Sequence, residues 1–161
     1  MIMGKIEKIK KGKRCVTQPF VLAGVIVEED ERFLLVQEEG KWNLPMGWVE
    51  LGEDLLSAAE REGREETGFK VKVKDFLGVY TAVKRRSGKV LHMVKFVFIA
   101  ERKGKSEKKS EGLKKKKFTF DEVKELREKD LLWHAEVVDQ LQDYKEGKRS
   151  SLERVSYFIV K

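Results

Sequence analysis

Residues 47–69, GWVELGEDLLSAAEREGREETGF, decide the fold of this chain. The segment opens as a glycine-rich loop and contains no proline from Asp54 to Thr67, which predicts an α-helix. Gly68 stands where a left-handed C-cap would end that helix. At about 100° per residue, Leu55, Leu56, Ala59 and Gly63 fall on one side, and this side is expected to face the core.

Three glutamates, Glu62, Glu65 and Glu66, lie at the edge of that apolar side. Carboxylates placed so close together lose hydration and repel one another, which raises their pKa values or destabilises the helix. A divalent cation would relieve the repulsion, because Mg²⁺ is commonly held by a few carboxylates together with substrate phosphates. Glu53, at the junction of loop and helix, could reach the same place. The alternative is a solvated helix held by intrahelical pairs such as Arg61 with Glu65.

The order of the residues favours the metal site. Gly, five residues, Glu, seven residues, Arg-Glu, two residues, Glu-Glu, one residue, Gly and an apolar residue is the pattern of the Nudix hydrolases, and residues 47–69 resemble it at nearly every defined position. Gly63 departs from the pattern, because an aliphatic residue is usual there. Glycine inside a helix costs roughly 0.5–1 kcal/mol relative to alanine, and it would leave a core gap for a neighbour to fill.

The resemblance implies an α+β fold, a Nudix-type α/β/α sandwich with a mixed sheet. It also implies hydrolysis of a nucleoside diphosphate linked to another group, with Mg²⁺ or Mn²⁺ as cofactor. The implied metal ligands are the Gly47 carbonyl and the carboxylates of Glu53, Glu62, Glu65 and Glu66, with Glu53 supporting the shell from the loop end. The implied catalytic residues are Glu62, which would also take the proton of the attacking water, Glu65, and Arg61, which would orient the carboxylates.

Family members often add an acid from the loop after the later strands. Four acids stand in that region of this chain, Glu101, Glu107, Glu111 and Asp121, and the sequence does not choose among them. A base within the helix is therefore the expectation. The lysines at 114–117 could instead hold substrate phosphates.

The resemblance implies a small-molecule nucleotide as substrate. After the subfamilies below are excluded, a nucleoside tri- or diphosphate remains, including one with an oxidised base. Lys84 to Ser87 occupy the positions where some pyrophosphatase subfamilies carry proline or tyrosine, and the motif of coenzyme A hydrolases is absent. Trp42, Trp48 and Tyr80 could stack on a base, although each is equally suited to a core. Two alternatives stay open: a hydrolase of RNA 5′ ends, and a non-catalytic Nudix module that senses a ligand.

The length of 161 residues suits one domain, residues 1–161. No apolar run is long enough to span a membrane and the first residues lack the apolar core of a signal peptide, so a cytoplasmic protein is expected. Cys15 is the single cysteine and cannot form an internal disulfide. His92 and His134 make no metal-spaced cluster with it.

The net charge of +7 is unevenly distributed. Residues 1–14 carry six Lys/Arg and one Glu, and residues 102–117 carry nine Lys/Arg and two Glu, so the rest of the chain is mildly acidic. The first segment is expected to be a frayed or edge-pairing terminus and the second a mobile loop. No aromatic residues alternate with the lysines for base stacking, so nucleic acid is not the favoured partner. The family leads us to expect a homodimer.

The remaining pattern predicts strands and two further helices. We expect strands at 20–27 and 33–37, a short edge strand or loop at 42–47, and a long hairpin of 76–83 with 90–100. We expect a short helix that is capped by Thr119 and Glu122 and reaches about Arg127, and a second helix from 131 to about 146. Residues 155–160 are expected to form a strand or an oligomer-pairing segment.

Overall fold

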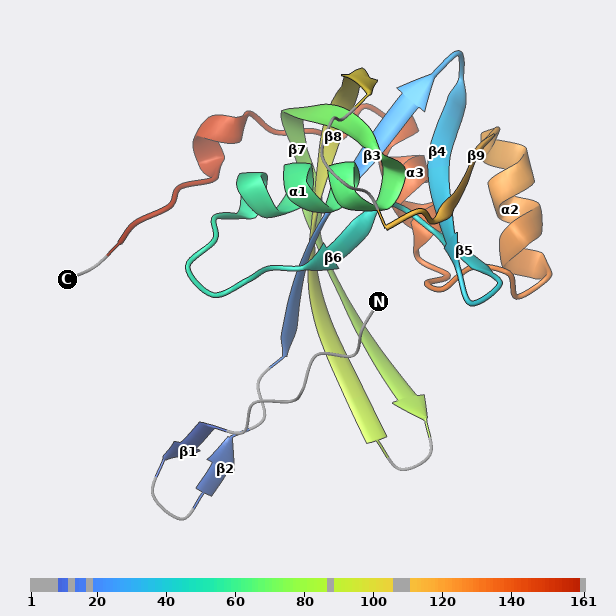
Figure 1. Ribbon diagram of the computed structural model, residues 1–161. Coiled ribbons are helices and arrows are strands. Elements are labelled where there is room, and N and C mark those ends of the chain that lie inside the picture. Colours follow the sequence, from blue (N-terminus) through green and yellow to red (C-terminus); the bar gives the residue numbers. More distant parts are fainter. Residues whose placement is uncertain (1–8, 12–13, 17–18, 87–88, 106–110, 160–161) are drawn as a thin grey trace.

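A computed structural model describes residues 9–11, 14–16, 19–86, 89–105 and 111–159. Its core is a mixed sheet in the order β5-β4-β3-β8-β7, with β6 beside β3 and β9 beside β4 (Figure 1). The elements are β1 (Ile9–Lys11), β2 (Arg14–Val16), β3 (Phe20–Glu29), β4 (Arg32–Glu38), β5 (Lys41–Asn43), β6 (Met46–Trp48), α1 (Leu55–Thr67), β7 (Phe69–Arg86), β8 (Lys89–Lys105), β9 (Lys114–Phe118), α2 (Phe120–Glu128), α3 (Val137–Lys145) and the 3-10 helix η1 (Leu152–Arg154).

Strand β3 is the centre of the sheet and is buried on both faces, as its apolar run predicts. It pairs in parallel with β8, from Phe20 opposite Met93 to Val27 opposite Ala100, and antiparallel with β4 and β6. Its alternate residues feed two cores. One core packs under α1, and the other packs under α2 and α3 on the opposite face. This arrangement confirms the α+β sandwich.

Helix α1 begins and ends where the sequence predicts. The Asp54 side chain accepts hydrogen bonds from the backbone N–H groups of Leu56 and Ser57, at 3.0 and 2.9 Å, and Gly68 closes the helix with φ of 70°. No gap is left beside Gly63, because a Cβ there would stand 2.7 Å from a methyl group of Val71 and 3.1 Å from one of Val25. The glycine therefore lets the helix approach the sheet closely.

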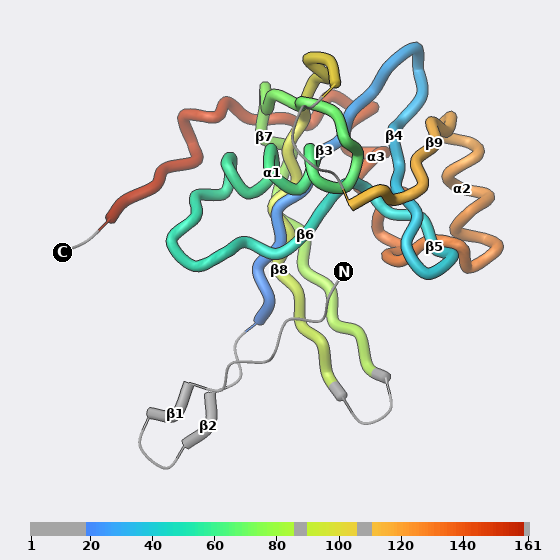
Figure 2. The backbone as a smooth tube through the Cα atoms, in the orientation of Figure 1, coloured from blue at the N-terminus to red at the C-terminus, as the bar shows by residue number. Residues whose placement is uncertain are grey.

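Strands β7 and β8 form the long hairpin that the sequence predicts, and both are longer than expected. Val71 and Val73, which follow α1, already belong to β7. The two strands run on together well past the rest of the sheet, so that the end of the hairpin projects from the body (Figure 2).

The prediction of one basic loop at 102–117 is wrong. Residues 102–105 extend β8, and Lys114–Lys117 begin β9, which pairs antiparallel with β4. Residues 106–110 lie outside the described residues. The lysine run can form a strand because its ammonium groups stand over aromatic rings, as Lys114 does over Trp42 and Lys116 over Phe118. Of the basic segment 1–14, residues 9–11 and 14 are described, and β1 pairs with β2 apart from the main sheet.

The C-terminal third differs from the prediction at two places. The helix expected from residue 131 begins only at Val137, because Trp42 binds the preceding segment through backbone bonds: its N–H donates to Leu131 at 2.8 Å, and its carbonyl accepts from Trp133 at 2.9 Å. Residues 155–159 form no strand but are extended, with Phe158 and Ile159 exposed. The capping box of Thr119 and Glu122 is confirmed at the start of α2. Among the described residues, no helix is long and apolar enough to cross a membrane.

The contact between Gly63 and Val71 predicts a non-additive pair of substitutions. Gly63→Ala should lower the free energy of unfolding by about 1–3 kcal/mol, because the overpacked methyl outweighs the gain in helix propensity. In the double variant with Val71→Ala the added methyl has room, so urea unfolding should give a loss smaller than the sum of the two single losses. Simple additivity would contradict this account of the glycine.

Candidate active site

The guanidinium of Arg61 is the centre of a polar network at the loop-proximal half of α1. Its Nε and Nη2 donate to both oxygens of Glu53 at 2.8 and 2.9 Å, and Nη2 also donates to the carbonyl of Trp48 at 2.8 Å. Its Nη1 donates to Glu62 at 2.6 Å and to Glu65 at 3.3 Å. This bidentate pair lowers the pKa of Glu53 and raises that of Arg61. The Arg61 to Glu65 pair, which the alternative of a solvated helix named, is also present.

Glu62 and Glu66 are the buried carboxylates of the network, 9% and 8% exposed. Burial raises the pKa of Glu62, and it raises the pKa of Glu66 to about 8 against one hydrogen bond from the Met46 N–H at 2.9 Å. The Glu62 carboxyl lies against Gly47, where a Cβ would stand 2.2 Å from its carbon. With the Glu62 carboxyl in this position there is no room for a side chain at position 47, and the backbone of β6 meets the acids of α1.

Glu65 lies on the outer side of the same helix turn. Arg64 donates to one of its oxygens at 2.7 Å and Arg61 to the other at 3.3 Å. Its side chain is 30% exposed, so both pairs are partly screened by water.

Of the four acids that the sequence left open, Glu111 is at the site. Its backbone N–H donates to the carbonyl of Glu65 at 2.8 Å, and its negative charge contributes to the raised pKa values of Glu62 and Glu66. Glu101 instead pairs with Lys103 at 2.6 Å. Asp121 pairs with Lys124 at 2.5 Å, and Glu107 lies outside the described residues. No spacing in the sequence could have selected Glu111, because its position depends on how β9 returns past α1.

The site offers carboxylate and carbonyl oxygens, which are the ligands that a divalent cation prefers, but these side chains do not converge on one point. Within the described ranges, no three Asp, Glu, His or Cys side chains stand close enough to hold an ion as they lie. The arginines account for this, because Arg61 and Arg64 occupy the oxygens of Glu65, and Arg61 one oxygen of Glu62. Glu62 and Glu66 are buried with raised pKa values beside a further acid and the backbone of Gly47. An additional positive charge would stabilise their ionised forms. To hold a cation, the carboxylates of Glu62 and Glu65 would have to turn from their arginine partners.

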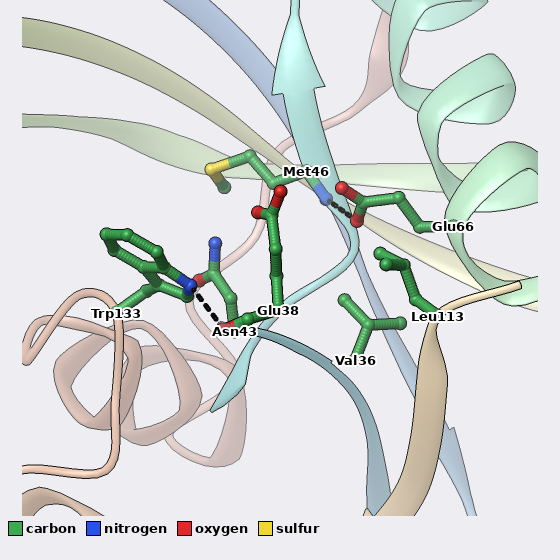
Figure 3. A pocket seen from close by; sticks show the side chains of 7 residues that line it. All are labelled: Val36, Glu38, Asn43, Met46, Glu66, Leu113 and Trp133. Carbon is green, nitrogen blue, oxygen red and sulfur yellow. Dashed lines mark hydrogen bonds between the residues drawn. The ribbon is translucent and has the colours of Figure 1, made fainter. Parts of the chain in front are cut away.

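A small cavity adjoins Glu66 (Figure 3). It is lined by Val36, Glu38, Asn43, Met46, Glu66, Leu113 and Trp133. The Oδ1 atom of Asn43 is buried there without a hydrogen-bond partner, and Trp133 is fixed by its Nε1, which donates to the carbonyl of Glu38 at 3.0 Å. The sequence interpretation missed this cavity, since it placed Trp133 on a helical stripe and did not single out Asn43.

The three aromatic residues expected to stack on a base are not among those lining this cavity. Trp42 is buried edge-to-face against Phe118, with ring centroids 4.8 Å apart. Trp48 packs in the same way on Phe20 at 4.1 Å. Tyr80 lies on the face opposite α1, where its hydroxyl donates to Asp143 on α3 at 2.8 Å.

Comparisons with known proteins agree with this fold. The family model described as NUDIX domain matches residues 18–141. An ADP-ribose pyrophosphatase of Methanocaldococcus jannaschii is 36% identical over 69% of this chain and 67% of its own length. The human 8-oxo-dGDP phosphatase NUDT18 is 33% identical over 53% of this chain, but the match spans only 26% of that protein. Among solved structures, a NUDIX hydrolase from Nitrosomonas europaea superposes with a TM-score of 0.78 and 27% identity, covering 88% of this chain and 98% of the other.

The raised pKa of Glu66 predicts how stability depends on pH when no metal is present. Between its ordinary value of 4.5 and its folded value of about 8, the folded protein keeps a proton that the unfolded chain has lost. The free energy of unfolding should therefore fall as pH rises through about this interval. Urea unfolding in chelator, compared at several pH values with Glu66→Gln, should show a shallower fall in the variant. Equal slopes would contradict the assignment.

Proposed function

The chain belongs to the Nudix family of hydrolases, and we propose that it hydrolyses the pyrophosphate linkage of a nucleoside diphosphate derivative at α1 with a divalent cation, Mg²⁺ or Mn²⁺. The observation that carries the proposal is the pair of buried carboxylates, Glu62 and Glu66, whose pKa values are raised beside the backbone of Gly47. Burying two carboxylates costs free energy, and a helix with a purely structural role gains nothing in return. In a site that binds cations together with a polyanionic substrate, the same carboxylates serve as ligands.

The residues proposed to hold the cations are the carboxylates of Glu62, Glu65 and Glu66, together with the Gly47 carbonyl. When bound, divalent cations neutralise charge on a pyrophosphate and make an attacking water more acidic. Glu53 acts one step further out, because its two oxygens fix the Arg61 guanidinium that orients Glu62 and Glu65.

Glu111 is proposed as the acceptor of the water's proton in place of Glu62. Glu62 is buried and one of its oxygens is bound to Arg61 at 2.6 Å, so it is poorly placed to take a proton from a water on the open side of the site. Glu111 is exposed, is tied by its backbone to Glu65, and lies close enough for its charge to act on both buried acids. A general base must reach the water from the open side of the site.

The organic part of the substrate is proposed to lie at the mouth of the cavity beside Glu66. The cavity itself has a volume of about 10 Å³, which is room for about one water molecule, so a base could contact Asn43 only after the lining side chains moved apart. The free Oδ1 of Asn43 would accept a hydrogen bond from a ring N–H or amino group, and the indole of Trp133 supplies an apolar wall. A nucleoside di- or triphosphate is the first candidate substrate, because the sequence leaves it by subtraction. ADP-ribose is the second candidate substrate, because the relative from Methanocaldococcus jannaschii bears the name ADP-ribose pyrophosphatase.

Substitution of Glu111 tests the role that the sequence could not assign. Turnover of a panel of nucleoside di- and triphosphates, ADP-ribose and capped RNA should require Mg²⁺ or Mn²⁺, and Glu65→Gln should abolish it. Glu111→Gln should lower kcat by about 10²–10⁴-fold, the range of a general base. Glu101→Gln, an acid of the same region paired with Lys103, is the matched control and should keep full activity. A Glu111→Gln enzyme with wild-type kcat would exclude this base.

Substitution of Asn43 tests the cavity. Asn43→Ala should raise KM for the preferred nucleotide by about 10-fold, the equivalent of one hydrogen bond of about 1.4 kcal/mol, while kcat for minimal substrates without a base stays unchanged. Gln37→Ala, on the neighbouring strand and bonded to the carbonyl of Gly40, should leave KM unaltered. If both variants keep the wild-type preference among bases, the base is bound elsewhere.

A further inference from the structure

The loop that enters α1 has an exposed tip with few contacts to the rest of the protein. Residues 50–53 form this loop tip. Among the described residues outside it, only Arg61 and Tyr157 form hydrogen bonds with it. Arg61 binds the carboxylate of Glu53, and the hydroxyl of Tyr157 donates to the carbonyl of Gly52 at 2.7 Å. Hydrogen bonds from two side chains therefore tie the loop tip to the body of the protein.

Tyr157 is brought to the loop tip by a segment that is anchored at successive points. Ser150 exchanges backbone hydrogen bonds with Phe76 of β7, at 2.9 and 2.7 Å. Leu152 of η1 and Val155 then pack against the core under α1. From there the chain continues on the side of the molecule where the loop enters α1 (Figure 1). Packed backbone thus presents the hydroxyl of Tyr157 to the loop tip.

The loop tip gains importance when a cation is bound, and at this step the inference rests on the proposed function. The Arg61 guanidinium binds Glu53, Glu62, Glu65 and the carbonyl of Trp48. Glu62 and Glu65 have to turn from it to bind a cation. The partners then left to Arg61 are the Trp48 carbonyl and Glu53, of which only Glu53 is charged. The position of Glu53 consequently decides where the positive charge of Arg61 lies beside the cation-binding carboxylates.

We propose that Tyr157 is a positioning residue of the active site, which holds the loop tip at Gly52 and thereby keeps Glu53 on the guanidinium of Arg61. The peptide unit that joins Gly52 to Glu53 is planar, so its two polar groups move together. Its carbonyl accepts the bond from Tyr157, and its N–H donates to the carbonyl of Glu50 at 3.1 Å. Both sides of the peptide unit are fixed, and the Glu53 side chain starts from a defined backbone.

The first test uses the protein without metal or substrate. Exchange of the Arg61 Nε–H with water, followed by NMR, reports how firmly Glu53 holds the guanidinium, because that N–H donates to Glu53 at 2.8 Å. Tyr157→Phe removes only the hydroxyl and should speed this exchange by about 3–10-fold, the equivalent of one hydrogen bond of ordinary strength. Tyr144→Phe is the matched control, because its hydroxyl donates to Glu28 at the face opposite α1, and it should keep the wild-type rate. A wild-type rate in Tyr157→Phe would overturn the proposal, whether or not the protein hydrolyses nucleotides.

A double-mutant cycle tests whether Tyr157 acts through Glu53. At saturating Mg²⁺, Tyr157→Phe should lower kcat for the best substrate by about 3–10-fold and leave KM unchanged, because Tyr157 does not contact the substrate. In a Glu53→Ala background, which already lacks the pair with Arg61, the same substitution should have no further effect on kcat. Circular dichroism checks that each variant is folded.

Equal losses of kcat in the two backgrounds would contradict the proposal, because a merely structural role of Tyr157 does not depend on Glu53. Absence of turnover by the wild type would instead count against the proposed function, and the exchange rate of the Arg61 Nε–H would then decide the role of Tyr157.

Discussion

The Arg61 guanidinium joins the parts of the molecule on which the active site depends. Through Glu53 and the Trp48 carbonyl it binds the loop that enters α1, and through Glu62 and Glu65 it binds the helix itself. Because the guanidinium is planar and keeps its charge, it fixes three carboxylates in orientation. One side chain thus positions the loop, the helix and the acids. These contacts give a physical reason for the spacing of Arg61 and the glutamates within residues 47–69.

Two close approaches complete the site, and each occurs at a glycine. Gly47 admits the carboxyl of Glu62 beside the backbone of β6, and Gly63 lets α1 rest on Val25 and Val71 of the sheet. The result places Glu62 and Glu66 at less than a tenth of their full exposure, where burial disfavours their charged form. The protein therefore carries a local cost that a bound cation would remove, and this cost links the stability of the fold to its proposed chemistry.

The sequence predicts what local patterns specify. The limits of α1 follow from Asp54 and Gly68, the start of α2 from its capping box, and the β7–β8 hairpin from its apolar runs. It fails where contacts distant in sequence decide. The lysines at 114–117 form a strand because β4 and the rings of Trp42 and Phe118 accept them, and Trp133 leaves the expected helix because Trp42 binds its backbone. The position of Glu111 and the cavity beside Glu66 depend on the same long-range contacts, so no local sequence motif predicts them.

Binding of Mn²⁺, followed by the loss of the electron paramagnetic resonance signal of the free ion, tests the central claim most directly, because it needs no substrate. The account predicts that the wild-type protein binds Mn²⁺, that Mg²⁺ competes for the site, and that Glu66→Gln binds it at least about 10-fold more weakly. Binding of equal strength in the variant, or no binding by the folded wild type, would contradict the assignment of the α1 carboxylates as a divalent-cation site.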